Sequence, residues 1–184
     1  MGYITLVVAG LAGVLVLVPL PPRPAHLFIA FALLIPARIQ GVLWREFFRG
    51  RHAMSEMRYG PAEQHFRAFL EALHTTPRLR FAIFLGWSFY TWNAEAMVRN
   101  NIGACQVNSG RLDAAESELK AAWALDDQYP IPVFNLAILA RARGQDDEAE
   151  RLRATAARLG YRAATRDRLI AAGGRVLAAI EGRL

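Results

Sequence analysis

The sequence predicts an all-α protein in which an N-terminal transmembrane helical hairpin is followed by a short solenoid of stacked helical hairpins with capping helices. Two observations support this expectation. Residues 2–20 carry no charged side chain, so they form an apolar run long enough for a membrane helix. Farther along, the chain aligns with itself when it is shifted by 34 residues, which is typical of repeated helical hairpins. We therefore expect a membrane anchor over residues 1–44 and two repeats over residues 95–160.

The first apolar run has the length of a membrane-spanning helix. At about 1.5 Å per residue, the 19 residues from Gly2 to Leu20 would extend about 28 Å, enough to cross the hydrocarbon core of a bilayer. A cleaved signal peptide is the competing interpretation. It is disfavoured because no positively charged side chain precedes the run and no small-x-small cleavage site follows it.

A second apolar stretch, residues 27–44, follows a proline-rich connector and is interrupted by Pro36, Arg38 and Gln40. An arginine inside a membrane span is costly unless its side chain reaches an interface. Arg38 lies in the second half of the stretch, close enough to do so. We expect the two stretches to form a tight hairpin, and an interfacial helix lying along the membrane is the alternative for the second.

The placement of arginines predicts the orientation of this anchor. The proline connector carries only Arg23, whereas residues 45–60 are expected to be a basic linker next to the membrane. Positive flanks favour the cytoplasmic side, so we expect an integral membrane protein, of the inner or plasma membrane if bacterial, with its repeats in the cytoplasm. These cations also suit anionic lipid headgroups. The expected membrane-interface residues are Arg38, Arg45, Arg49, Arg51 and Arg58.

Residues 61–94 are expected to contain half of a repeat followed by an aromatic packing helix. The half-repeat would end at Pro77. Residues 81–92 are apolar or aromatic on nearly every helical face, yet they are too few to span a bilayer. We expect this segment to pack between the half-repeat and the first full repeat. In the alternative, Trp87, Tyr90 and Trp92 contact the membrane interface or a partner subunit.

The residues that coincide under the 34-residue shift have structural roles. In each copy a first helix leads into a glycine-containing turn, and the second helix carries alanines that allow a close helix crossing. Replacing either alanine at the crossing by leucine should overpack that contact. Residues 161–184 are expected to form C-terminal capping helices. The coinciding pairs are Asn101 with Asn135, Gly110 with Gly144, Ala115 with Ala149, Ala122 with Ala156, and Leu125 with Leu159.

In its period and in these positions the region resembles the tetratricopeptide repeat (TPR) family. Ile102 and Gly103 match the large-then-small pair of that family's first helix. Arg99 stands where the family has an aromatic residue, which departs from its pattern. The resemblance implies paired antiparallel helices that stack into a superhelix with a concave binding groove. Generic alanine-rich helical hairpins are the alternative.

The resemblance further implies that the first helices of the repeats line a groove for a protein partner. Because the implied residues are mostly apolar with a few amides and one cation, a helix or an apolar peptide is the expected ligand. Phe134 and Ile138, one helical turn apart, would be its apolar anchor. The implied groove residues are Met97, Asn100, Asn101, Ala104, Val107, Asn108, Ile131, Phe134, Asn135, Ile138 and Arg141.

No pattern in the sequence indicates catalysis, a metal site or a cofactor. The four histidines lack metal-ligand spacing, and Cys105 has no histidine near it in the sequence. The net charge of +6 does not indicate nucleic-acid binding either, because residues 113–150 carry nine acidic against three basic side chains. We expect a non-enzymatic membrane-anchored scaffold that binds a protein. A small structural accessory subunit of a larger integral-membrane complex is the alternative.

Overall fold

The computed structural model describes residues 38–85 and 90–182, and every regular element in these ranges is helical. The all-α prediction is therefore confirmed for this part of the chain. No helix within these two ranges combines the length and the apolar character that crossing a bilayer requires. The expected helix over residues 2–20, most of the second apolar stretch and Trp87 lie outside the described residues.

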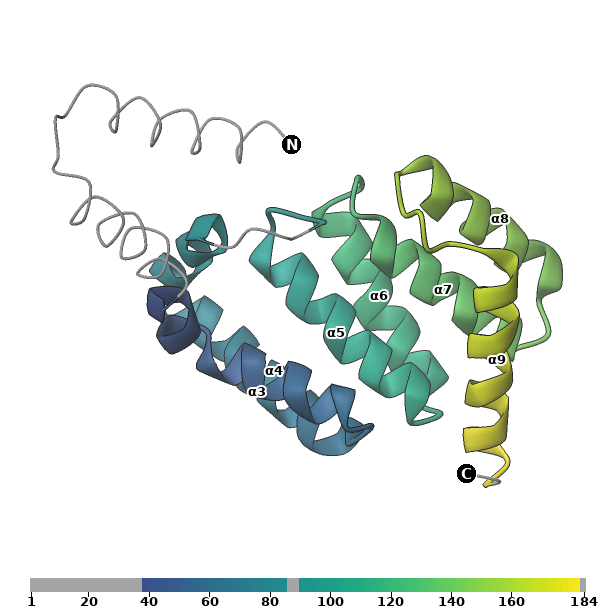
Figure 1. Cartoon of the computed structure of the whole chain (residues 1–184), viewed down its shortest axis with the longest axis horizontal. Helices are drawn as coiled ribbons and strands as arrows, with labels where there is room; N and C mark the ends of the chain where they lie inside the picture. Colours follow the sequence, from purple (N-terminus) through teal and green to yellow (C-terminus); the bar gives the residue numbers. More distant parts are fainter. Residues whose placement is uncertain (1–37, 86–89, 183–184) are drawn as a thin grey trace, which may run out of the picture.

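The helices pack as a row of hairpins. Neighbours along the chain pair with each other, α3 with α4, α5 with α6 and α7 with α8, and α9 packs across α7. Figure 1 shows α3 and α4 at one end of the row and α9 at the other. After a helical stretch over residues 38–43, the elements are α3 (Arg45–Ser55), α4 (Tyr59–Thr75), a 3-10 helix η1 (Pro77–Leu85), α5 (Ala94–Asn108), α6 (Leu112–Leu125), α7 (Pro130–Ala142), α8 (Asp146–Arg158) and α9 (Arg166–Ile180).

The 34-residue shift corresponds to a repeated turn. Gly110 ends the turn after α5 and Gly144 the turn after α7, and both have a φ of 74°, which favours glycine. The next residue donates its backbone N–H in the same way in both copies, from Arg111 to Gln106 and, 34 positions later, from Gln145 to Ala140. These bonds close the end of the first helix and direct the chain into the second.

The two helices of the first repeat approach closely because small residues lie between them. Ala115 and Ala122 of α6 are fully buried, and their counterparts in α8 are buried as well. Gly103 of α5 lies against Leu119, so a Cβ atom placed there would be only 2.7 Å from the Leu119 Cγ atom. The sequence identified these positions because the small residues recur at the repeat period.

Residues 45–60 were expected to be a linker, and they instead form α3 and the start of α4. Trp44 and Phe47 are almost completely buried, with ring centroids 5.3 Å apart in an edge-on arrangement. Gly50, one turn later, lies against the ring of Phe66 and lets α4 approach. The arginines alone suggested a linker, whereas the aromatic residues on the other face of the same segment determine that it folds as an amphipathic helix.

The aromatic segment 81–92 was expected to be a packing helix, but its described residues, 81–85 and 90–92, do not form an α-helix. The 3-10 helix η1 ends at Leu85, and α5 begins separately at Ala94. The side-chain oxygen of Asn93 accepts a hydrogen bond from the backbone N–H of Ala96 at 3.1 Å, which caps the N-terminus of α5. Asn93 therefore starts a new helix and does not continue an earlier one.

The 3-10 helix η1 contains both buried and exposed side chains. Ala82 and Ile83 belong to the core, whereas Phe81 and Phe84 are 69% and 49% exposed. The indole N–H of Trp44 donates to the carbonyl oxygen of Leu79 at 2.9 Å, which attaches η1 to the beginning of α3. The core packing that we expected for this segment therefore applies to part of it only.

The N-terminal hairpin and the repeats are joined by a buried carboxylate. Glu63 of α4 is 6% exposed and accepts hydrogen bonds from Gln106 at 3.0 Å, from Arg67 and from Arg111. Burial alone would raise the pKa of Glu63, but the hydrogen bonds from Arg111, Gln106 and Arg67 hold it below its ordinary value. Glu63 is thus an ionised side chain that links α4 to α5 and to the turn before α6.

Replacing Gly103 by alanine should destabilise the protein, although alanine is the better helix former. The new methyl group would overlap Leu119, which is fully buried, so we expect a loss of about 1–3 kcal/mol in the free energy of unfolding. Urea denaturation followed by circular dichroism measures this loss. Gly174→Ala in α9 is the matched control, because no described atom beyond its chain neighbours and the backbone of its own helix lies within 4 Å of its Cβ position, and a gain of up to about 1 kcal/mol is expected. Equal effects of the two substitutions would contradict the close packing of α5 on α6.

Candidate functional site

An open cavity of about 550 Å³ lies between the two ends of the row of helices. One wall comes from α3, the opposite wall from Tyr161 and the start of α9, and α5 and α7 lie between them. This volume is typical of ligand pockets. We call this cavity the groove, and its lining residues are Phe47, Arg51, Met54, Ser55, Tyr90, Met97, Asn100, Asn101, Ala104, Tyr129, Ile131, Asn135, Tyr161 and Arg168.

The groove brings together part of the residue set that the TPR resemblance implies. The residues of that set that line it come from α5 and α7, the first helices of the two repeats, and they are Met97, Asn100, Asn101, Ala104, Ile131 and Asn135. The others of the implied set do not line the groove. The walls come from elements outside the repeats, which the period of the sequence does not reveal.

The expected apolar anchor is buried. Phe134 is 3% exposed and packs among core residues that include Ala137 and, from α9, Leu169. Its ring meets that of Tyr161 edge-on, with centroids 5.3 Å apart, so it supports the groove wall from behind. Ile138, also in α7, is half-buried and packs against core residues. Phe134 lies in the core because α9 covers the face of α7 that was expected to bind a partner.

The remaining expected groove residues form contacts elsewhere. Val107 of α5 is buried in a core shared with neighbouring helices. Asn108 donates its side-chain N–H to the Ala104 carbonyl of its own helix at 2.8 Å. Arg141, expected as the only cation of the groove, instead pairs with Asp146. Its aliphatic stem runs against Gly173 of α9, where a Cβ atom would lie 2.6 Å from the Arg141 Cγ atom.

The cations that line the groove come from its two walls. Arg51 belongs to α3 and Arg168 to the first turn of α9, and neither forms an ion pair with any other described residue. The sequence did not indicate that either arginine lines the groove, and Arg51 was expected at the membrane interface. A signal was present in α3, because Phe47, Arg51, Met54 and Ser55 follow helical spacing and share one face.

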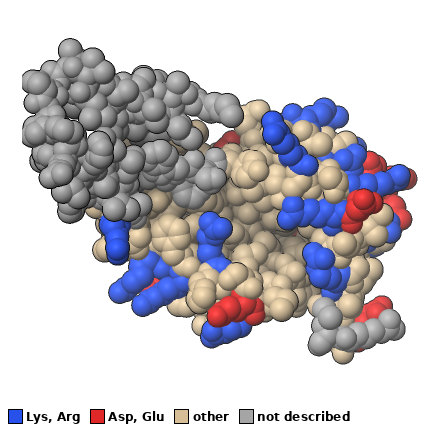
Figure 2. Space-filling model, in the orientation of Figure 1, with Lys and Arg blue, Asp and Glu red and all other residues tan. Residues whose placement is uncertain are grey.

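The other arginines expected at a membrane interface lie outside the groove. Arg45 and Arg49 both contact Glu46, at 3.5 and 2.9 Å, and Arg58 contacts Glu56 at 3.1 Å. Arg38 is exposed before the start of α3. On the face shown in Figure 2, Lys and Arg surround a largely uncharged centre, with fewer Asp and Glu among them.

A pair of amides connects the two repeats at the base of the groove. The Asn135 side-chain N–H donates to the side-chain oxygen of Asn100 at 2.8 Å, across the contact between α5 and α7. Asn100 is 4% exposed, and its own amide N–H group has no acceptor among the described residues. Asn101, which coincides with Asn135 under the repeat shift, bonds instead to the Met97 carbonyl of its own helix at 2.8 Å.

Aromatic side chains complete the walls. Tyr90 meets Tyr161 edge-on with ring centroids 5.7 Å apart, and Tyr129 is 3% exposed. Burial raises the pKa of the Tyr129 phenol, as do Tyr161 and Asp126, and the positive charge of Arg51 opposes them. Tyr129 is therefore a neutral phenol whose environment includes the Arg51 charge.

Reactive groups among the described residues do not converge on the groove. Burial raises the pKa of the Cys105 thiol to about 12, so this thiol is not a nucleophile at neutral pH. In residues 38–85 and 90–182, no group of three or more His, Cys, Asp or Glu side chains is arranged to hold a metal ion. The groove is lined by charged, amide and aromatic side chains.

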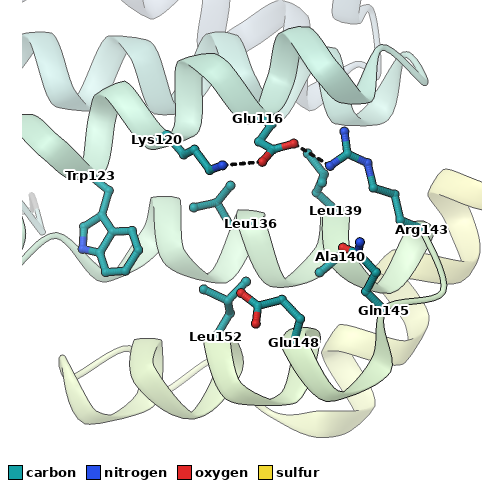
Figure 3. A pocket seen from close by; sticks show the side chains of 10 residues that line it. All are labelled: Glu116, Lys120, Trp123, Leu136, Leu139, Ala140, Arg143, Gln145, Glu148 and Leu152. Atoms are coloured by element: carbon teal, nitrogen blue, oxygen red, sulfur yellow. Dashed lines mark hydrogen bonds and ion pairs between the residues drawn. The ribbon is translucent and has the colours of Figure 1, made fainter.

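A second hollow, of about 170 Å³, lies between α6, α7 and α8. Figure 3 shows Glu116 contacted by Lys120 and Arg143, at 2.5 Å each, and Glu148 pairs with Arg151 outside the hollow. Hydrogen bonds from Lys120 and Arg143 hold the pKa of Glu116 below its ordinary value. Because these charges are already paired, the hollow offers less to a ligand than the groove does.

Comparisons of this chain with family models, curated proteins and solved structures give no match. Geometry and charge are therefore the basis for assigning a function.

Replacing Phe134 by alanine should destabilise the fold. The side chain is almost fully buried in the core under α9, so we expect a loss of about 3–5 kcal/mol in the free energy of unfolding, measured by urea denaturation. Ile131→Ala is the control, because Ile131 lines the groove and is only half-buried, and its loss should be clearly smaller. A Phe134→Ala protein as stable as the wild type would show that Phe134 is free to act as an exposed anchor.

Proposed function

We propose that this protein is a membrane-anchored, TPR-like α-solenoid that acts as a scaffold and binds a segment of a partner protein in the groove. The observation that carries the proposal is the groove itself, about 550 Å³ in volume and lined from α3, α5, α7 and α9. Its lining combines aromatic and apolar side chains with amides and cations, the mixture with which proteins recognise extended peptides.

The repeated hairpins support a binding role. Their turns share one hydrogen-bonding pattern, and the groove lies against the first helix of each repeat, where the concave surface of helical repeat proteins binds partners. The helices α3, α4 and α9 take the place of capping repeats at the two ends.

The anchor is proposed from the sequence. The charge-free residues 2–20 and the apolar residues 27–44 would form a membrane hairpin, and the arginines that follow favour a cytoplasmic groove.

A structural accessory subunit of a membrane complex is the second candidate. It is favoured by the exposed apolar side chains close to the proposed anchor, since Val42 and Phe81 are 77% and 69% exposed. In this case the main contact surface would be the end of the row that carries α3 and η1, and the groove would have no ligand of its own.

Photo-crosslinking in cells should separate these two functions. We expect a p-benzoylphenylalanine placed at Asn101, in the groove, to crosslink a discrete partner, because a bound segment would contact this position. The same probe at Lys120 of α6, outside the groove, is the control and should give no such product. Crosslinking from Phe81 and none from Asn101, analysed on denaturing gels, would instead support the accessory subunit.

Membrane attachment should depend on residues 1–37. We expect the full chain to stay with membranes during alkaline carbonate extraction, and a chain that begins at Arg38 to be soluble with an unchanged melting temperature. A cut near Met57 would be a poor test, because it also removes Trp44 and Phe47 from the core. If the shortened chain remains in the carbonate pellet, the anchor lies elsewhere, with the exposed side chains of η1 as the first candidates.

A further inference from the structure

Among the described residues, the groove is lined by positively charged side chains and by no negatively charged ones. Arg51 and Arg168 are its charged residues, and the lining contains no Asp or Glu. The acidic side chains of the repeats belong mainly to the second helices, α6 and α8, such as Glu116 and Glu150. The two sides of the stack therefore differ in electrostatic character, and the groove is the cationic side.

The two groove arginines have no acidic partner among the described residues, unlike several arginines of the repeats. Arg99 contacts both Glu95 and Glu118 at 3.0 Å, and Arg143 likewise bridges two acidic side chains. No described acidic side chain lies within ion-pair distance of Arg51 or Arg168. Because the walls are partly apolar, two unneutralised guanidinium groups will favour a negatively charged ligand there more strongly than on an open surface.

The base of the groove offers a hydrogen-bond donor as well. Asn100 is 4% exposed, its side-chain oxygen accepts a hydrogen bond from Asn135, and its amide nitrogen, which has no partner among the described residues, keeps some contact with solvent. This donor can bond to a carbonyl or carboxylate oxygen that enters the groove. The side-chain N–H group of Asn101 already bonds to the Met97 carbonyl of its own helix, so its side-chain oxygen is the atom available to a ligand N–H group.

The dimensions and the walls fit a peptide better than a small inorganic anion. A cavity of about 550 Å³ is much larger than one phosphate or sulfate group needs. Met54, Ile131 and Tyr161, which are half-buried, supply apolar and aromatic contacts in addition to the two cations. In an extended segment with alternating acidic and apolar side chains, the acidic side chains can pair with the arginines and the apolar side chains can pack on these surfaces. The backbone of the segment can form hydrogen bonds with the asparagine amides.

We propose that the groove binds a peptide segment rich in Asp or Glu, whose carboxylates pair with Arg51 and Arg168 while its backbone bonds to Asn100. The acidic ligand takes the place of the apolar peptide expected from the sequence, and both cations come from outside the two repeats. This assignment rests on the proposed scaffold function and specifies its partner.

Peptide selection on the whole protein tests the ligand class. The probe is a library of short random peptides displayed on phage, selected against the full chain in zwitterionic lipid nanodiscs. We expect enrichment of Asp and Glu in the bound peptides. The affinity of the best peptide is then measured by fluorescence anisotropy, and it should fall with rising salt and when its Asp and Glu are replaced by Asn and Gln.

Paired variants test the site. Arg51→Gln combined with Arg168→Gln should weaken binding of that peptide by about tenfold or more, because two charge-assisted contacts are lost. Both arginines are exposed and unpaired among the described residues, so the melting temperature should not change. Arg78→Gln combined with Arg175→Gln removes the same charge from exposed positions outside the groove and should leave the affinity within about twofold.

Each other outcome overturns the proposal in a distinguishable way. Enrichment of apolar or basic peptides that still compete for the groove would overturn the acidic ligand and leave the scaffold function standing. An equal loss in both double variants would show non-specific attraction to a basic protein. Displacement of the peptide by inorganic phosphate or by phosphatidylglycerol vesicles, abolished in the Arg51 and Arg168 variant, would assign the site to a phosphate or a lipid headgroup. If no peptide is selected, the scaffold function fails as well.

Discussion

The buried carboxylate of Glu63 joins the N-terminal hairpin to the repeats, and the position of the groove wall follows from it. An ionised side chain that is 6% exposed needs its hydrogen bonds, and it obtains them from Gln106, Arg67 and Arg111. Two of these partners lie beyond α4, one in α5 and one in the turn before α6. Because α3 packs on α4, this contact and the apolar packing of α4 on α5 together orient α3 relative to α5. The way in which α4 is held against α5 thus contributes to placing Arg51 at the groove.

The opposite wall depends on how α9 packs on α7. Leu169 of α9 lies in the same core cluster as Phe134, so the helix that covers α7 removes the expected apolar anchor from the surface. The same helix brings Arg168, one position earlier, to the edge of the groove. The packing of α9 on α7 thus has two effects on the groove. It buries the expected aromatic anchor, and it places a cation at the edge of the groove. The groove is for this reason more polar than the first helices of the repeats alone would make it.

The parts of the fold that could be predicted from the sequence are those that recur locally. The turn glycines, Gly110 and Gly144, and the crossing alanines of α6 and α8 repeat at a fixed period, so they identify the two hairpins. α3 was missed because its arginines suggested a linker, although Trp44 and Phe47 already had helical spacing. The walls of the groove could not be derived in this way. They depend on contacts between segments far apart in the chain, which no local pattern encodes.

Two repeats are fewer than a helical stack usually needs to be stable, and this shortage explains why stability and binding involve the same elements. The open ends of the stack are covered by α3 with α4 on one side and by α9 on the other. These covering helices bury the aromatic core at the N-terminal end and the side chain of Phe134 at the C-terminal end. They also carry Arg51 and Arg168 on their remaining faces. In a longer solenoid the ligand site can lie far from the caps, whereas here the helices that complete the core also form both walls of the groove. Its charge is consequently a property of the caps, and the repeats contribute the amides and the apolar base between them.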